Sequence, residues 1–157
     1  MKIIPRKAVE SDLELYFDWA NDIDTRNNSF NSQTIDFQTH TSWFLRKIVD
    51  NNTLMLVFEN EDTIPVGQVR IEQKHEENII GISIDKNFRG LGLAVQMLEN
   101  TCKLFFEEFD EKIIHAYIKK NNLASVKSFN KAGFQEEKEL LIGNEASYLL
   151  VKNKKYV

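Results

Sequence analysis

A loop with two glycines, residues 89–94, carries the clearest chemical signal in the sequence. It reads Arg-Gly-Leu-Gly-Leu-Ala, and it joins an apolar, strand-like stretch at residues 79–85 to a segment at residues 93–109 with a helical apolar stripe. The first turn of a helix has unpaired N–H groups and a positive dipole end, and small residues let an anion approach them. We therefore predict a pyrophosphate site here, although two glycines can also make no more than a tight turn.

Two other nucleotide-binding loops do not fit this spacing. A Walker loop ends in Gly-Lys-Ser/Thr, which is absent at this position. A dinucleotide fingerprint needs a small residue where Val95 stands, and it opens a parallel sheet, whereas the strands expected before this loop look antiparallel. Neither motif explains the loop.

The loop and a later segment together resemble the GNAT superfamily of acetyltransferases. The pyrophosphate loop of that superfamily reads Arg/Gln-x-x-Gly-x-Gly/Ala, and Arg89, Gly92 and Ala94 stand at its three defined positions. Its second motif, Asn-x-x-Ser/Ala followed by aromatic-x-Lys-x-Gly-Phe, is matched at residues 122–125 and 129–134, with the family's spacing between the motifs. The resemblance extends over essentially the whole chain.

This resemblance implies a fold class, a cofactor and an activity. The fold is α/β (α+β), a GNAT fold whose mixed, mostly antiparallel central sheet is flanked by helices and splayed between its fourth and fifth strands. Acetyl-CoA is expected in that gap, and its acetyl group is expected to move to a primary amine. The implied cofactor-binding residues are Ser83, Ile84, Arg89, Gly90, Leu91, Gly92, Leu93, Ala94, Asn122, Ser125 and Phe129.

Several of these residues have implied roles. Backbone groups near Ser83 and Ile84 would pair with the pantetheine arm, and Ser125 with Phe129 would line the sulfur end of the cofactor. Asn122 would bond the pantetheine or orient its loop, with a simple helix cap as the alternative. Many family members have a Tyr general acid where Phe129 stands, which puts that acid role in doubt here.

Aminolysis of a thioester needs a neutral amine, but an alkyl amine with a pKa near about 10.4 is mostly protonated at neutral pH. A base or a water relay should therefore remove a proton. The candidate bases, each on a strand expected to border the gap, are Glu72, Asp85, His115 and Tyr117. His115 and Tyr117 alternate with apolar residues and so share a strand face, which an ordinary half-buried polar face would also explain.

A polar and aromatic stretch at residues 19–44 is expected to form the acceptor pocket. Together with residues 67–70 it resembles GNAT enzymes that acetylate nucleotide-linked amino sugars, of the pseudaminic acid pathway type. Arg26 and Arg70 could hold the diphosphate of such an acceptor. The aromatic residues Trp19, Trp43 and Phe44 can equally belong to the core. The expected acceptor-binding residues are Arg26, Asn28, Ser29, His40, Trp43, Gln68 and Arg70.

The alternative acceptors are a protein N-terminus or lysine, or a small polyamine. A polyamine site should be acidic, whereas the stretch at residues 19–44 is mixed in charge. A noncatalytic acyl-CoA-binding sensor is the alternative from a different class, and Phe129 in place of Tyr favours it.

The elements expected to position these residues follow from hydrophobic periodicity. A Ser-x-x-Glu capping box at residues 11–14 should open the first helix, and residues 21–34 read as a polar loop. The strand, long helix and strand at residues 79–119 demand a parallel crossover. The expected strands are 3–8, 54–59, 66–73, 79–85, 113–119, 134–141 and 147–152, and the expected helices are 11–19, 36–49, 93–109 and 124–132.

The bulk composition sets the class of protein. A chain of 157 residues with 42% hydrophobic and 28% charged residues is expected to form one domain, residues 1–157. A net charge of −4 argues against a nucleic-acid partner, and the absence of a long apolar run argues against a membrane partner or a signal peptide. We expect a cytoplasmic monomer or homodimer with a small-molecule amine acceptor. Cys102 is the only cysteine and the histidines are scattered, so we expect no metal.

Overall fold

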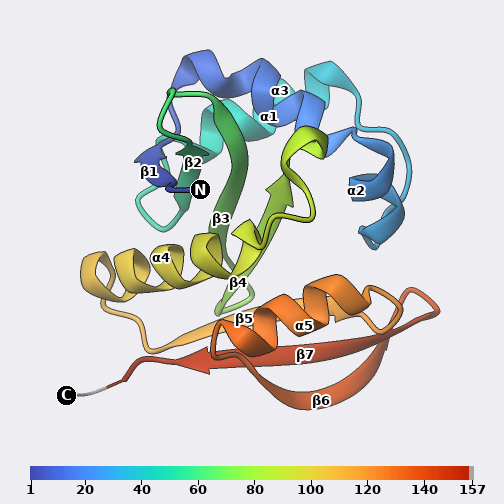
Figure 1. Ribbon diagram of the computed structural model, residues 1–157. Coiled ribbons are helices and arrows are strands. Elements are labelled where there is room, and N and C mark those ends of the chain that lie inside the picture. The colour runs from blue at the N-terminus through green and yellow to red at the C-terminus, as the bar shows by residue number, and fades with distance from the viewer. Residues whose placement is uncertain (156–157) are drawn as a thin grey trace.

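Seven strands form one mixed sheet in the computed structural model, which describes residues 1–155 (Figure 1). Their order across the sheet is β1-β2-β3-β4-β5-β7-β6, so β1 and β6 are the edge strands. Only β4 and β5 run parallel among these neighbours. The strands are β1 (Ile4–Lys7), β2 (Leu54–Glu59), β3 (Pro65–Lys74), β4 (Glu77–Ile84), β5 (Ile113–Lys119), β6 (Gln135–Ile142) and β7 (Glu145–Asn153).

Helices cover both faces of the first half of the sheet. Alternate residues of β2 show this, because Leu56 and Phe58 pack in the cluster that contains α4, whereas Met55 and Val57 pack with α1 and α3. No helix within residues 1–155 has the length and apolar character needed to cross a membrane. The helices are α1 (Leu13–Ala20), α2 (Ile23–Asn28), α3 (Phe37–Lys47), α4 (Leu93–Glu108) and α5 (Leu123–Lys131), with short 3-10 turns η1 (Glu10–Asp12) and η2 (Lys86–Phe88).

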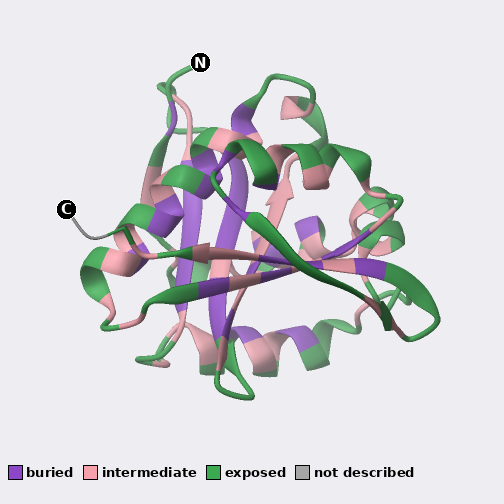
Figure 2. Cartoon of the chain, turned by 90° about the horizontal axis from the view of Figure 1, so that it is seen from below, coloured by how far each residue is buried: buried purple, intermediate pink, exposed green. Residues whose placement is uncertain are grey.

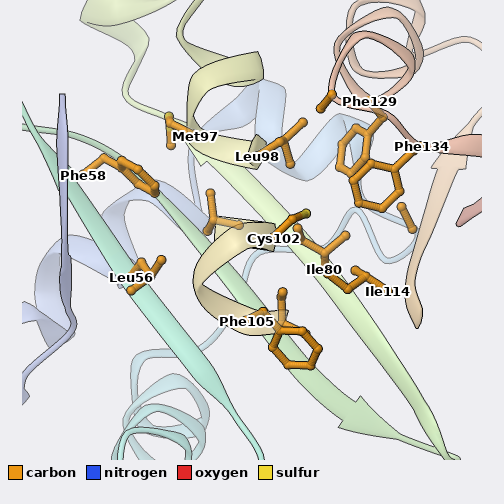
Figure 3. Close-up of a cluster of buried hydrophobic side chains, with 14 of the residues drawn as sticks. Leu56, Phe58, Ile80, Met97, Leu98, Cys102, Phe105, Ile114, Phe129 and Phe134 are labelled. Carbon is orange, nitrogen blue, oxygen red and sulfur yellow. The ribbon is translucent and has the colours of Figure 1, made fainter. Parts of the chain in front are cut away.

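The main core lies between α4 and the sheet and continues under α5 (Figure 3). The stripe predicted for the long helix provides Leu98, Cys102 and Phe105, each no more than 1% exposed. On the α5 side, Phe129 and Phe134 meet edge to face with ring centroids 5.0 Å apart. This continuous apolar contact holds the two halves of the sheet together.

The sheet splits between β4 and β5, as the resemblance implied. The two strands share one residue pair, Ile79 with His115, and no further register. On its other edge β4 remains paired with β3 as far as Ile84, and β5 remains paired with β7 as far as Lys119. The last residues of β4 are therefore only half-buried, unlike the buried strands β2 and β3 (Figure 2).

Two local predictions were wrong. Residues 21–34 do not form only a loop, because α2 begins where the Asp22 carboxylate accepts the N–H of Thr25. The capping box at residues 11–14 does not form either. Residues 10–12 make η1 instead, and the Asp12 carboxylate accepts the N–H of Val9 and binds Arg6 through two bonds of 2.8 Å.

Leu98 and Leu141 offer a matched test of this core. Replacing the fully buried Leu98 with alanine should lower the free energy of unfolding by about 2–5 kcal/mol, because the helix and sheet cannot close the cavity. Leu141→Ala removes the same atoms at a site that is 74% exposed, and its effect should stay within about 0.5 kcal/mol. Urea unfolding of both variants measures the difference, and equal losses would contradict this description of the core.

Candidate active site

The glycine loop ends in a helix start that has no side-chain cap. Gly92 is the N-cap of α4, with a φ of +73°, and Gly90 has a φ of +76°. In contrast, Asp22, Asp36 and Asn122 cap α2, α3 and α5 with their side chains. The N–H groups of residues 93–95 consequently find no acceptor within residues 1–155. Such a helix start binds anions.

The space in front of this loop is open. A Cβ atom built on Gly90 or Gly92 would meet no other atom within 4 Å. Leu93 is buried and anchors the first turn of α4 in the core, while Leu91 is 54% exposed. A left-handed backbone with free N–H groups and room before it fits the diphosphate of coenzyme A.

Arg89 links the loop to α2. Its guanidinium lies 2.7 Å from the carboxylate of Asp22 and 3.1 Å from that of Asp24, and its Nε donates to the carbonyl of Ile84. Burial raises the pKa of Asp22, but bonds from Arg89 and from Thr25 outweigh it, and the pKa lies below its usual range. The phosphate-binding role of Arg89 stays a prediction, and its present contacts fix α2 against the end of β4.

The other expected cofactor residues lie around the gap. Ser83 and Ile84 pair with β3 on one side and have no ladder partner on the side that faces β5. Asn122 accepts the N–H of Ser125 at 3.4 Å, which matches the alternative reading of this residue as a helix cap. Phe129 is 3% exposed and belongs to the main core.

The carboxylates of Glu72 and Asp85 are held by structural contacts. Glu72 lies on β3, so the expectation that it borders the gap was wrong. Trp43 donates to it, and Lys47 and Arg70 lie within 3.5 Å. Burial raises the pKa of Glu72, but the charges of Arg70 and its neighbours outweigh burial and lower it. Asp85 follows β4, and its two oxygens accept the N–H groups of Trp19 and Asn87.

His115 and Tyr117 lie on one face of β5, as predicted. Both contact Glu77, a residue that the sequence analysis did not select. Glu77 at the start of β4 accepts the hydroxyl of Tyr117 at 2.6 Å, and its other oxygen lies 3.4 Å from Nε2 of His115. Burial and the bond to Glu77 raise the pKa of Tyr117 to about 12. Glu77 escaped the sequence analysis because its strand was expected to begin at residue 79.

The expected acceptor residues divide into two groups. Arg26 donates to the carbonyls of Asn31 and Gln33 and to Ser29, so it closes the loop after α2, whose last residue Asn28 is exposed. His40 is 3% exposed and contacts the carbonyl of Leu13 at 2.9 Å, so it belongs to the packing between α1 and α3.

Arg70 packs against β4, one of the two strands that border the gap. A Cβ atom on Gly81 of β4 would stand 3.0 Å from its guanidinium. The same guanidinium packs on the ring of Trp43, 5.6 Å from its centroid. Gln68, two residues before Arg70 on β3, donates its side-chain amide N–H to the hydroxyl of Ser83 at 3.1 Å.

Three buried side-chain atoms have no hydrogen-bond partner within residues 1–155: Nε of Arg26, Oε1 of Gln68 and Nδ1 of His115. Buried polar atoms are nearly always paired, and exceptions need an explanation. All three belong to residues that the sequence analysis named as site residues. Each of these three atoms is therefore free to bond to a group of a ligand.

A family model matches most of the sequence of this chain. Residues 2–135 match the model described as an acetyltransferase (GNAT) domain. The chain belongs to the GNAT acetyltransferase family. Family membership makes acetyl-CoA the expected acyl donor, and the open, uncapped start of α4 fits its diphosphate.

One relative matches in sequence, and solved structures of lower identity share the fold. An uncharacterized protein of Methanocaldococcus jannaschii is 28% identical over 148 residues, or 88% of this chain, and this chain spans about 29% of that protein's length. Spermidine N-acetyltransferase from Vibrio cholerae, solved with CoA and spermine, has a TM-score of 0.85 at 18% identity and covers 96% of this chain and 95% of its own. An aminoglycoside acetyltransferase solved with coenzyme A and kanamycin has a TM-score of 0.81 at 15% identity and covers 98% and 95%.

Gly92 and Gly143 provide a matched test of the anion site. Both have a left-handed backbone and open space before them, but Gly143 lies in the turn between β6 and β7. Valine imposes similar backbone strain at either position. Gly92→Val should weaken acetyl-CoA binding about tenfold or more, because it disturbs charge-assisted bonds to the diphosphate. Calorimetry should give an unchanged affinity for Gly143→Val, and equal affinities of both variants would contradict the assignment.

The stability of the GNAT domain should depend on pH through His40. Burial lowers the pKa of His40, which the carbonyl of Leu13 offsets only in part. In the unfolded chain His40 binds a proton with a pKa near 6.5, whereas in the folded chain it binds that proton only at lower pH. The stability is complete above a pH of about 6.5 and falls as pH drops below it, by up to about 1.4 kcal/mol per pH unit. Unfolding curves of His40→Gln should lack this decline, whereas the exposed-residue control His75→Asn should keep it.

Proposed function

We propose that this chain transfers the acetyl group of acetyl-CoA to a primary amine on a nucleotide-linked amino sugar. The observation that carries the transferase assignment is the uncapped start of α4 at Gly92, next to the unpaired edge of β4. The two features together fit a diphosphate joined to an extended arm. They are also close in the chain, because β4 ends at Ile84 a few residues before the loop.

The residues of this chain have separate tasks in the proposed reaction. The free N–H groups at residues 93–95 bind the diphosphate, and the backbone of β4 orients the arm along the gap. The acyl donor supplies the thioester. The two strands meet at the vertex of the gap, where Ile79 pairs with His115, and the gap ends there. Binding and alignment of this kind account for much of the rate enhancement in acyl transfer.

The charge distribution supports an anionic acceptor. Arg26 has no carboxylate within salt-bridge distance among residues 1–155, and burial together with the nearby charge of Arg70 lowers its pKa. Arg70 itself shares Glu72 with Lys47 and Lys74. A diphosphate between the two guanidinium groups would remove their mutual repulsion and receive paired N–H donors.

A second candidate acceptor is a polyamine. A hollow of about 260 Å³ adjoins the vertex of the gap, and its lining contains three carboxylates, one ammonium group and His115. An acidic hollow attracts a chain of ammonium groups. The two solved relatives also act on cationic amines by their names, namely spermidine and an aminoglycoside. The cations at Arg26 and Arg70 are the feature that favours the amino sugar instead.

A screen separates these possibilities. The protein is incubated with acetyl-CoA and nucleotide-linked amino sugars, polyamines, amino acids or peptides, and the mass gain of each acceptor is recorded together with free-thiol release. Acetylation of sugar nucleotides supports the proposal. Acetylation of polyamines or peptides alone overturns the sugar assignment but not the transferase, and acetyl-CoA binding without thiol release from any amine supports the sensor.

Arg70→Gln tests the acceptor assignment directly. Loss of a charge-assisted bond of about 1.5–3 kcal/mol should raise the KM of the sugar nucleotide at least about tenfold, with the KM of acetyl-CoA unchanged. Lys74→Gln is the matched control, since it removes another cation near Glu72 from a side chain that is 53% exposed. Steady-state kinetics with varied sugar nucleotide measures both, and a KM that is the same for the two variants contradicts the proposed role.

A further inference from the structure

Three titratable side chains meet at the vertex of the gap. Glu77 begins β4, and His115 and Tyr117 stand on the same face of the neighbouring β5. The carboxylate of Glu77 is shared, because Oε1 accepts the Tyr117 hydroxyl at 2.6 Å and Oε2 lies 3.4 Å from Nε2 of His115. Each oxygen of the carboxylate thus faces one partner on β5.

This arrangement determines which nitrogen of His115 carries the proton. A carboxylate oxygen can only accept a hydrogen bond, so of the two neutral tautomers of the imidazole it favours the one with hydrogen on Nε2. Nδ1 then presents a lone pair. That atom is buried and has no partner within residues 1–155, and the ring as a whole is 16% exposed.

We propose that Glu77 is a positioning residue that holds His115 in the Nε2–H tautomer, so that Nδ1 takes the proton that the acceptor amine loses. The inference rests on the proposed transferase function. It assigns Glu77, which no sequence motif marked, and it selects His115 from the four candidate bases. Glu72 and Asp85 are excluded from this role because other side chains and backbone groups occupy their oxygens.

Tyr117 supports the same arrangement. Its hydroxyl donates to Glu77, and a raised pKa of about 12 keeps it protonated at neutral pH. It therefore orients the carboxylate and does not compete with His115 for the proton of the amine. A carboxylate that is fixed on one oxygen has less freedom to turn its other oxygen away from the ring.

The cluster lies at the closed end of the gap between β4 and β5. The free edge of β4 leads from the loop at Gly92 back to Ile79, the residue paired with His115. At this vertex the neutral amine nitrogen attacks the thioester carbonyl carbon, and its proton passes to Nδ1. The carbon–sulfur bond then breaks, and the same proton moves from His115 to the thiolate. The products are the acetylated amine and the free thiol of CoA, and His115 is again neutral.

The tautomer can be observed without an acceptor. Long-range ¹H–¹⁵N correlation spectra of the uniformly labelled protein distinguish protonated from unprotonated ring nitrogens, and a His115→Gln variant assigns the signals. The parent protein should show Nε2–H with an unprotonated Nδ1. Glu77→Gln keeps the shape but can donate to Nε2, so it should shift the ring toward Nδ1–H. A parent ring protonated on Nδ1, or an unchanged tautomer in Glu77→Gln, overturns the proposal.

The second test is kinetic. Hydroxylamine is the acceptor probe, and the readout is the rate of thiol release after subtraction of the rate measured without protein. Glu77→Gln should lower kcat about 100-fold, the range for loss of a general base, and leave the dissociation constant of acetyl-CoA within about twofold. Glu76→Gln is the control, because it removes the same charge from the adjacent, exposed residue. Tyr117→Phe should keep the tautomer and lower kcat only a few-fold, which separates the proton role from a general structural one.

The outcomes distinguish this inference from the proposed function. Equal rates for the parent protein, Glu77→Gln and Glu76→Gln overturn the role of Glu77 and leave the transferase intact. A parent protein that binds acetyl-CoA but does not accelerate thiol release above the protein-free rate with hydroxylamine, polyamines or sugar nucleotides overturns the transferase function instead. In that case the spectra still decide whether Glu77 fixes the tautomer of His115.

Discussion

The separation of β4 from β5 is the constraint on which the rest of this molecule depends. A strand edge inside a sheet normally satisfies its N–H and C=O groups with the next strand, and unpaired edges are costly when they are buried. Here the two strands share one residue pair at Ile79 and then part. The chain keeps this opening because α4 and α5 share one apolar core beneath it, with Leu98 on one side and Phe129 on the other. The apolar core on the α4 and α5 face of the sheet thus holds β4 and β5 in place while their edges stay apart beyond Ile79.

The opposite face is held by specific polar contacts. Lys119 at the end of β5 is 7% exposed, and its ammonium donates to the carbonyl of Asn27 in α2 at 3.0 Å. Arg89, after β4, binds Asp22 at the other end of the same helix. The short helix α2 therefore contacts both arms of the split sheet.

Much of the fold could be predicted from the sequence because its signals are local. Periodicity placed β2 and β5 correctly, and the glycines at positions 90 and 92 marked the loop before α4, where both have a positive φ. Other features depend on partners that are distant in sequence. Glu72 was selected as a candidate base because it lies on a strand that the sequence predicts. The residues that occupy its carboxylate, Trp43 and Lys47, come from α3, and no local pattern shows this contact. Glu77 matters only through its contacts with β5, which no local pattern shows.

The two edge strands of the sheet, β1 and β6, have features that hinder pairing with a strand of another chain. β1, at one end, is four residues long. β6, at the other end, is longer, but it carries Glu136, Lys138 and Glu139 as exposed residues and has a bulge between Glu136 and Lys138. Short strands, charged side chains and bulges all hinder a second chain from adding to an open edge. The molecule can therefore hold one unpaired edge open for a ligand in its centre while both outer edges resist strand-to-strand aggregation.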